Sequence, residues 1–522
     1  MRFVGPAVSR RRFTAQLLQA SAAVLTARAQ TATTPAGPGI RNGTLPSIAG
    51  GVMSGDVTTN SAVLWSRADR PARLWVEWST TESFSNPRVV SGPLSGPDAD
   101  YTAKLELTNL PPGERIFYRA RFENPDGRGR GEPVVGQFVT APTDSRSITF
   151  AWSGDTCGQG YGTSPDRRGM KTYAALREAR PDFFIHSGDT VYADNPILES
   201  VTLADGSKWQ NWVMDEKTKV AESLDEFRAS FRYNLADEHV RAFNATTPIL
   251  AQWDDHEVRN NWYPGQTLES DPRYREKDVN VLSARARQAF FDYQPVAPRA
   301  DSRIYRVVPR GPLCDLFFID LRSYRGPNSA NRQPQLTAES AILGHSQLNW
   351  LKESLLASRA TWKVICSDMP LALLVGDGKD RWEAFANGDS GIPAGRELEV
   401  ADLLSFLKAQ KIRNVIWLTA DVHYAASHYY DPAQAKFTDF DPFWEFVSGP
   451  LHAGTFGPNS LDGTFGPVAR WTARPSGSAP SGPYSLEQYF GQVHIDGRTR
   501  VATVSHHNRD GTRLWSLDLP PN

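Results

Sequence analysis

Four short acidic motifs, each placed directly after an apolar run, constrain this chain of 522 residues more than any other feature. The apolar runs have the length and composition of buried strands. Carboxylate, imidazole, thiol and phenol groups that follow neighbouring strand ends can meet at one edge of a sheet and bind more than one metal ion. The pattern therefore predicts a multinuclear metal site and an enzyme. The motifs are Asp155-Thr156-Cys157, Gly188-Asp189-Thr190-Val191-Tyr192, Asp254-Asp255-His256-Glu257 and Asp421-Val422-His423.

Apolar runs alternate with segments of helical length from residue 147 to about residue 515. This alternation predicts an α/β domain whose functional groups lie at strand ends. The expected strands cover 148–152, 183–185, 247–251, 316–319, 364–365 and 415–418, and the expected helices cover 168–179, 224–234, 278–292, 347–358 and 397–409.

Residues 47–142 show short alternating apolar runs separated by turn clusters rich in proline, glycine and asparagine. That spacing predicts a small all-β sandwich of the immunoglobulin or fibronectin type III kind. No catalytic spacing occurs in it, so we interpret it as an accessory module. The expected strands cover 62–65, 74–78, 104–107, 116–122 and 137–140.

The first 29 residues resemble a twin-arginine export signal. The basic segment 9–13 precedes a short apolar stretch and the triplet Ala27-Arg28-Ala29, which has the small residues of a signal-peptidase site. An ordinary basic amphipathic start or a short membrane anchor is the alternative, but the stretch is shorter than the roughly 20 residues of a membrane span. Residues 30–46 read as a linker. We expect a periplasmic or secreted protein that uses the twin-arginine export machinery.

The net charge does not indicate nucleic acid or an anionic membrane as the main partner. The net charge is −1, and loss of the five arginines of the signal would bring it to about −6. No later segment is long and apolar enough to span a membrane. The sequence does not predict the oligomeric state.

Cys157 and Tyr192 suggest the identity of one metal. Cys314 and Cys366 lie inside apolar runs and are expected to be buried small residues, whereas Cys157 follows a Gly/Asp turn. A thiolate selects a transition metal. A phenol with a pKa of about 10 binds a metal as phenolate only when a highly charged cation lowers that pKa. The two side chains together favour iron over zinc.

The adjacent carboxylates Asp254 and Asp255 repel each other and need a cation or hydrogen bonds to stay ionised. Asn261 follows in the same segment. A dense set of oxygen donors suits a hard divalent cation such as calcium or magnesium.

In this order, the motifs resemble the metallophosphoesterase pattern D-x-H, GDxxD, GNHE and a late histidine motif. Cys157 stands where that pattern has a histidine, and Tyr192 stands where it has an aspartate. Both replacements are typical of the PhoD-like alkaline phosphatase and phosphodiesterase family. The export signal, the N-terminal β segment and the segment 320–325 agree with this resemblance, which covers essentially the whole mature chain.

The resemblance implies a four-layer α/β/β/α fold and a centre of ferric iron (Fe³⁺) and calcium (Ca²⁺). The implied iron ligands are Cys157, Asp189, Tyr192, Asp421 and His423, with Asp189 as the bridging carboxylate. The implied calcium ligands are Asp254, Asp255 and Asn261. The resemblance leaves the role of Asp155 open, because iron already has five candidate ligands.

The implied reaction is hydrolysis of phosphate monoesters and diesters by a metal-bound hydroxide. Arg322 and Arg325 are expected to hold the phosphoryl oxygens, with structural ion pairing as an equal alternative for either one. His256, or His423 if it is not a ligand, is expected to protonate the leaving alkoxide, and Glu257 to support the site from behind.

Two other functions stay open at this point. The same scaffold could carry a phosphodiesterase of the phospholipase D type, which prefers lipid head-group diesters. The chain could also be a metal-stabilised binding module of the cell envelope without catalytic activity. No motif in the sequence identifies the natural substrate.

Overall fold

The computed structural model describes residues 45–299, 301–473 and 481–522. The expected signal (1–29) and nearly all of the expected linker (30–46) lie outside the described residues. From Leu45 onward the chain forms one unit, in which the N-terminal strands pack against the rest. The limits of separate domains at residues 142 and 147 stay predictions.

The N-terminal strands form the expected β-sandwich. One sheet has the order β1 (Ile48–Gly55), β2 (Ala62–Ala68), β5 (Thr102–Leu107), and the facing sheet has the order β4 (Arg88–Ser95), β3 (Ala72–Ser79), β6 (Arg115–Glu123), β7 (Val134–Val139). Alternate residues of β3 and β6 face the core between the sheets, as period-2 patterning requires. The strands β1 and β4 were not expected, because three glycines interrupt β1 and β4 is mostly exposed.

Two larger sheets face each other in the remainder of the chain. The first has the order β12 (Ile249–Gln252), β9 (Phe183–Ser187), β8 (Ile148–Ser153), β20 (Tyr489–Ile495), β21 (Ala502–Asn508), β22 (Arg513–Leu519). The second has the order β13 (Arg306–Pro309), β14 (Cys314–Phe318), β15 (Trp362–Cys366), β16 (Val415–Thr419), β18 (Phe443–Val447), β17 (Ala426–Tyr430), β19 (Pro467–Thr472). Buried side chains of both sheets form a shared core, which includes Cys314 and Cys366 as expected.

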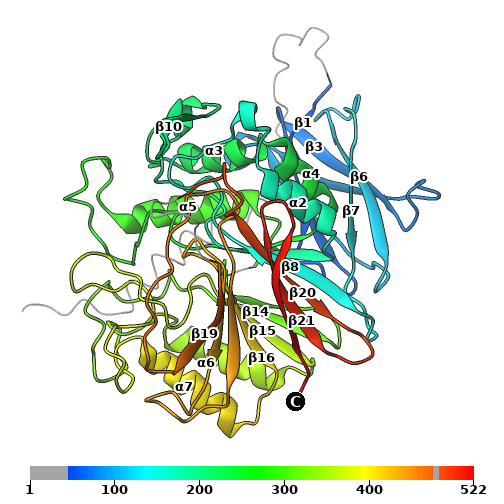
Figure 1. Cartoon of the computed structure of the whole chain (residues 1–522). Helices are drawn as coiled ribbons and strands as arrows, with labels where there is room; N and C mark the ends of the chain where they lie inside the picture. The colour runs from blue at the N-terminus through cyan, green and yellow to red at the C-terminus, as the bar shows by residue number, and fades with distance from the viewer. Residues whose placement is uncertain (1–44, 300, 474–480) are drawn as a thin grey trace, which may run out of the picture. The chain divides into compact units, whose positions relative to one another are not determined.

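Helices cover the outer faces of the two sheets (Figure 1). The first sheet packs against α2 (Lys171–Ala179), α3 (Leu224–Leu235), α4 (Glu238–Thr246) and α5 (Val279–Tyr293). The second sheet packs against α6 (His345–Ala357) and α7 (Glu397–Ala409). This is the four-layer α/β/β/α arrangement that the family resemblance implied.

Most expected helices begin and end within three residues of the observed ones. The helix expected from residue 168 begins at Lys171, because Arg168 and Gly169 have φ angles of 60° and 70°, outside the helical region. Helix α3 begins at a capping box in which Ser223 and Glu226 satisfy each other's backbone N–H groups.

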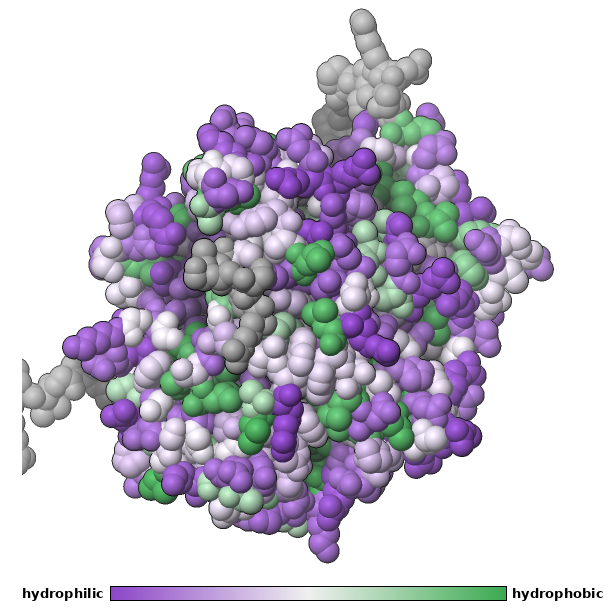
Figure 2. Space-filling view, viewed as in Figure 1, coloured by the Kyte–Doolittle hydropathy of each residue, from purple (hydrophilic) through white to green (hydrophobic). Residues whose placement is uncertain are grey.

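Polar side chains cover most of the molecular face in Figure 2, and apolar side chains form small separate patches there. The mean hydropathy of −0.44 agrees with such a surface. In the part of the chain that the structure describes, no helix combines the length and the apolar character that a membrane crossing requires.

Two short further elements lie between β9 and α3 along the chain. The hairpin β10 (Ser200–Thr202) and β11 (Lys208–Gln210) pairs only with itself, and the 3-10 helix η3 (Asp215–Lys217) follows it. Lys217 of η3 is buried and donates to the carbonyl oxygens of Tyr192 and Asn195. The hairpin and η3 therefore help to fix the segment after β9.

Candidate metal centre

The first aspartate of each motif lies two residues beyond the end of a strand. Strands β8, β9, β12 and β16 end at Ser153, Ser187, Gln252 and Thr419, and the first aspartates of the motifs are Asp155, Asp189, Asp254 and Asp421. The first three strands belong to the first sheet and β16 belongs to the second. The site therefore lies where the carboxyl ends of both sheets meet.

The backbone of these motifs is unusual. Asp155, Asp189, Asp421 and His423 have φ angles of 67°, 50°, 65° and 59°, in the left-handed region that residues other than glycine rarely adopt. Such conformations are typical of functional sites, where the surrounding structure holds them. Here each one turns the chain sharply at a strand end, so that the side chain projects over the edge of the sheet.

Among the described residues, three groups of carboxylate and imidazole side chains place their ligand atoms within 4.8 Å of one another. We call them clusters 1, 2 and 3. Cluster 1 is Asp155, Asp189 and His423; cluster 2 is Asp189, Asp255 and His256; cluster 3 is Asp254, Asp255 and Asp421.

Tyr192 completes cluster 1. Its hydroxyl lies 2.8 Å from Nε2 of His423 and 3.5 Å from Oδ1 of Asp155. Nδ1 of His423 donates to the carbonyl oxygen of Gly454, so Nε2 is left to face the cluster. Three oxygen donors and one nitrogen donor therefore converge on one point.

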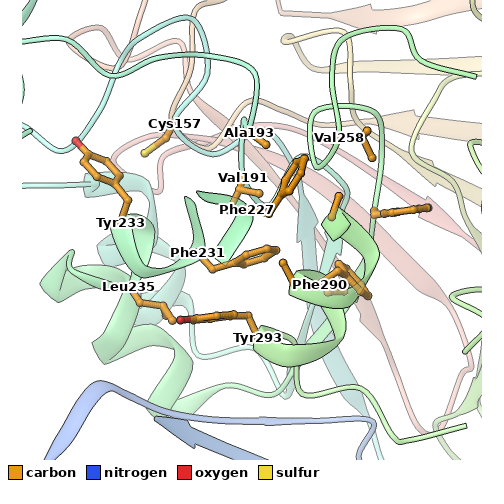
Figure 3. Close-up of a cluster of buried hydrophobic side chains, with 14 of the residues drawn as sticks. Cys157, Val191, Ala193, Phe227, Phe231, Tyr233, Leu235, Val258, Phe290 and Tyr293 are labelled. Carbon is orange, nitrogen blue, oxygen red and sulfur yellow. The ribbon is translucent and has the colours of Figure 1, made fainter. Parts of the chain in front are cut away.

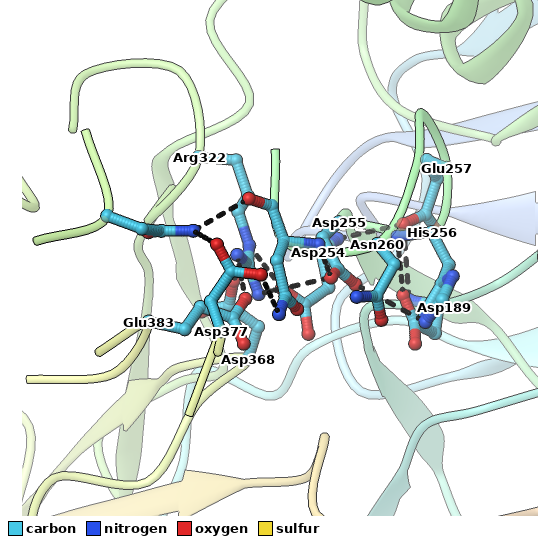
Figure 4. Close-up of polar contacts among 12 residues, drawn as sticks. Asp189, Asp254, Asp255, His256, Glu257, Asn260, Arg322, Asp368, Asp377 and Glu383 are labelled. Carbon is cyan, nitrogen blue, oxygen red and sulfur yellow. Dashed lines mark hydrogen bonds and ion pairs between the residues drawn. The ribbon is translucent and has the colours of Figure 1, made fainter. Parts of the chain in front are cut away.

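Asp189 links clusters 1 and 2, and Asp255 links clusters 2 and 3. Shared carboxylates are the ligands that hold neighbouring cations close together. Figure 4 shows Asp255 between Asp189 and His256 on one side and Asp254, Arg322 and Asp368 on the other.

Glu257 ties the loops of the site together from behind. Its carboxylate accepts hydrogen bonds from the backbone N–H groups of Asp189, Thr190 and Asp254 and from the hydroxyl of Thr190. This placement agrees with the supporting role that the sequence suggested for Glu257. The segments after β9 and β12 are thereby held in one arrangement.

His256 forms a dyad with Asp194. Nδ1 of His256 lies 2.6 Å from Oδ1 of Asp194, and Nε2 lies 3.9 Å from Oδ1 of Asp255. Burial by itself would lower the pKa of His256, but the carboxylates of Asp194 and Asp255 outweigh it and raise that pKa to about 9. The two carboxylates therefore favour the protonated form of His256.

The buried carboxylates and the phenol of the site favour the binding of cations. Burial raises the pKa of Asp189, and the neighbouring carboxylates of Asp255 and Asp254 raise it further. Burial and the carboxylates of Asp189 and Asp155 likewise raise the pKa of the Tyr192 phenol. Oδ2 of Asp155 and Oδ1 of Asp255 are buried without a hydrogen bond. Bound cations would satisfy these oxygens and reverse the pKa shifts, so the donor set fits metal ions.

Arg322 and Arg325 are buried and engaged with protein groups. Arg322 donates to Asp254 with a distance of 2.6 Å from Nε to Oδ1, and it also pairs with Glu383. Arg325 donates to Oδ1 of Asn328 and to the carbonyl oxygen of Glu383. These bonds fit the structural alternative, but Nε and Nη1 of Arg325 are buried without a hydrogen bond, so the phosphate-clamp role stays a prediction.

Asp368, Glu383 and Asp194 are functional candidates that the sequence analysis missed. Asp368 follows β15 by two residues, has no exposed surface, and lies 3.8 Å from Nε of Arg322. Burial and the carboxylate of Asp254 raise the pKa of Asp368. The rule that located the four motifs, an acid two residues beyond an apolar strand, also locates Asp368.

Family comparison now adds to this geometry. Residues 150–506 match the family model of the PhoD-like phosphatase, and residues 31–142 match that of the PhoD-like phosphatase N-terminal domain. The chain belongs to the PhoD-like phosphatase family. The family resemblance of the motifs is thus confirmed.

The relatives of this PhoD-like chain share its architecture. Alkaline phosphatase D of Bacillus subtilis (strain 168) is 26% identical in an alignment of 407 residues that covers 72% of this chain and 64% of the relative. The chain thus spans less than two thirds of the length of that relative. A solved structure of PhoD is 20% identical with a TM-score of 0.64 and covers 92% of this chain and 94% of its own. Purple acid phosphatase PPD1 of yellow lupin (Lupinus luteus) is 12% identical, with a TM-score of 0.54 over 91% of this chain and 74% of its own.

The main difference from the expected ligand set concerns Cys157. Its side chain lies in the hydrophobic cluster drawn in Figure 3, together with Tyr233 and Phe231. Burial raises the pKa of the thiol, and its main charged neighbours are Lys217 and Asp237. Cys157 belongs to none of the three clusters, whereas Asp155, whose role was open, occupies cluster 1.

Asp421 and Asn261 also differ from their expected places. Asp421 lies in cluster 3 with the two aspartates that were assigned to calcium, although it was expected with iron. The backbone N–H of Asn261 donates to Oδ2 of Asp255, and its side-chain amide donates to Oδ1 of Asp377. Asn261 therefore positions Asp255 in this structure.

Proposed function

We propose that this chain hydrolyses phosphate monoesters and diesters at a centre that holds ferric iron and calcium. The proposal rests on the approach of Asp189 of cluster 1 to Asp255 of cluster 3, because these two carboxylates meet in cluster 2 and cations in clusters 1 and 3 would therefore be neighbours. The membership of the chain in the PhoD-like phosphatase family supports the reaction class.

Cluster 1 suits ferric iron. Asp155, Asp189, Tyr192 and His423 would supply three hard oxygen donors and one imidazole. A buried phenol beside two carboxylates ionises only when a strongly charged cation compensates the cost, and ferric iron provides that charge. Cys157 is left out of this revised set.

Cluster 3 suits calcium. Asp254, Asp255 and Asp421 offer only oxygen atoms, and Asp368 adds a further buried carboxylate close to Asp254. Hard divalent cations prefer such sets. The ion pair of Arg322 with Asp254 would orient one of the ligands.

When bound, the cations would neutralise the phosphoryl oxygens and make a water molecule more acidic. The residues of the chain have separate tasks. Protonated His256, held by Asp194 through Nδ1, would donate the proton at Nε2 to the leaving alkoxide. Glu257 and Asn261 would keep Asp189 and Asp255 in place.

Export by the twin-arginine pathway is part of the proposal and rests on the sequence of residues 1–29. Replacement of both Arg10 and Arg11 by lysine should leave the protein in the cytoplasm of an expressing cell. Cell fractionation measures this, and unchanged export of the double variant would contradict the pathway.

The activity is tested with protein loaded with iron and calcium. We expect turnover of p-nitrophenyl phosphate and bis-p-nitrophenyl phosphate, and a loss of at least about 100-fold in Asp189→Asn. Asp166→Asn, at an exposed position outside the four motifs, is the matched control and should keep full activity. Preferential hydrolysis of phosphatidylcholine would favour the phospholipase-type reaction instead. Folded, metal-loaded protein without turnover of any of these esters would indicate a binding module.

A further inference from the structure

Phe456 places a partly exposed aromatic ring directly beside cluster 1. Its ring stacks on the imidazole of His423, with 5.0 Å between ring centroids and 29° between ring planes. The side chain is 40% exposed, although buried His423 lies beneath it. Of the large apolar side chains that are exposed in the described part of the chain, Phe456 is the one with a ring contact to a cluster residue.

The loop that carries Phe456 is fixed in place. The carbonyl oxygen of Gly454 accepts a hydrogen bond from His423, and the backbone N–H of Gly454 donates to Oε1 of Gln159. The backbone N–H of Thr455 donates to the carbonyl oxygen of Ser481. The ring of Phe456 is therefore presented by a loop bonded to the metal centre itself.

Phe456 continues a row of rings that starts at the proposed proton donor. His256 stacks on Tyr192 with 4.1 Å between ring centroids, and the hydroxyl of Tyr192 reaches His423. Phe456 then lies on His423. The row runs from the proposed site of proton transfer to the molecular surface.

The side of the site next to Asp255 is polar. Asp377 accepts from the amides of Asn261 and Asn328, and its loop carries the exposed side chains of Lys379 and Arg381. The two sides therefore differ. A substrate substituent that extends past cluster 1 contacts an aromatic ring, and one that extends past Asn261 contacts charged side chains.

We propose that Phe456 is a specificity-determining residue that stacks against the alcohol portion of the substrate and favours phosphate esters of aromatic alcohols. This inference rests on the proposed function. The cations would fix the phosphoryl group, so the ester substituent must extend to the rim, where an aromatic group gains from offset stacking. A purely structural Phe456 that only shields His423 would affect all esters equally.

The test compares substrates within one variant. In metal-loaded protein, Phe456→Ala should lower kcat/KM for 1-naphthyl phosphate roughly 3- to 10-fold while kcat/KM for ethyl phosphate changes less than about twofold. Phe456→Trp should retain the preference for the aromatic ester. Ile392→Ala, which removes another highly exposed apolar side chain, is the matched control and should change neither value. Equal losses for both esters in Phe456→Ala would overturn the inference.

Binding measurements separate this inference from the proposed function. Calorimetry with phenylphosphonate and methylphosphonate, which are not hydrolysed, should show tighter binding of the phenyl compound to the unmodified protein and a reduced difference in Phe456→Ala. If neither ester is hydrolysed but this difference is present, the proposed function fails and the aromatic site stands. If Phe456→Ala loses iron, Phe456→Leu supplies the same comparison with an apolar side chain that lacks a ring.

Discussion

At the scale of single residues, the centre depends on where each side chain points after its strand ends. Asp155 and Cys157 are two residues apart and both have left-handed backbone conformations, with φ angles of 67° and 68°. Asp155 nevertheless joins cluster 1, and Cys157 turns into the hydrophobic cluster behind it. The sequence motif alone allowed both side chains to be ligands, because spacing does not show direction in an irregular turn.

The two residues of this motif give a paired prediction. Asp155→Asn should lower the iron content of purified protein at least several-fold, because it removes a charged donor of cluster 1. Cys157→Ser should leave the iron content near that of the unmodified protein, because the thiol lies outside the clusters. Metal analysis of both variants measures this. Loss of iron in Cys157→Ser with retention of iron in Asp155→Asn would instead show that the Cys157 thiolate binds the iron.

At the scale of secondary structure, the strands that carry the motifs were predictable and several others were not. Apolar runs marked β8, β9, β12, β14, β15 and β16, because strands buried on both faces need continuous apolar residues. Strands β17, β19, β20, β21 and β22 were missed because polar residues such as His428, His506 and Arg513 interrupt their apolar pattern. Asp368 was missed for another reason, since it lies outside the four motifs that matched a known pattern.

Close approach of the segments after β9 and β12 gives a prediction for Gly188. Its φ angle is 102°, and an added Cβ would lie 2.5 Å from Cβ of Asp254. Gly188→Ala should therefore displace the segment of Asp189 and lower kcat/KM at least about tenfold, with a loss of bound metal. Gly206→Ala is the matched control, because its φ angle is 83° but no atom lies within 4 Å of the added Cβ. Equal effects of the two substitutions would show that backbone strain, and not the contact with Asp254, is responsible.

At the scale of the whole molecule, the N-terminal sandwich is bonded to the helical layer beside the first sheet. Nε1 of Trp65 donates to the carbonyl oxygen of Asp292 at 2.7 Å, and the carboxylate of Asp100 pairs with Arg232 of α3. Lys104 of β5 lies over the ring of Phe291 at 6.0 Å. The sandwich thus packs against α3 and α5, and Asn234 of α3 in turn donates to the carbonyl oxygen of Thr190 after β9. The accessory role of the sandwich stays a prediction.

Lys104 gives a stability prediction for this interface. Burial lowers the pKa of Lys104 to about 8, although Asp292 and Asp56 oppose the shift. The unfolded chain therefore binds more protons than the folded chain between about pH 8 and pH 10.5, and Lys104 makes stability rise with pH across that window. Lys104→Met should raise the free energy of unfolding at pH 7 by about 1 kcal/mol, and this gain should vanish above pH 10.5.

Chemical denaturation at pH 7, 9 and about 10.5 compares the variant with the unmodified protein. Lys208→Met, at an exposed position of β11, is the control and should change stability little at any of these pH values. A gain in Lys104→Met that is constant with pH would show that apolar packing, and not the buried charge, is the cause.

The visible spectrum of protein loaded with iron and calcium tests the proposed centre most directly. A phenolate bound to ferric iron gives a ligand-to-metal charge-transfer band. We predict such a band in the unmodified protein and in Cys157→Ser, and its loss in Tyr192→Phe with iron still bound through Asp155, Asp189 and His423. A colourless, iron-free and fully active protein, or a band that persists in Tyr192→Phe and disappears in Cys157→Ser, would contradict the iron site proposed at cluster 1.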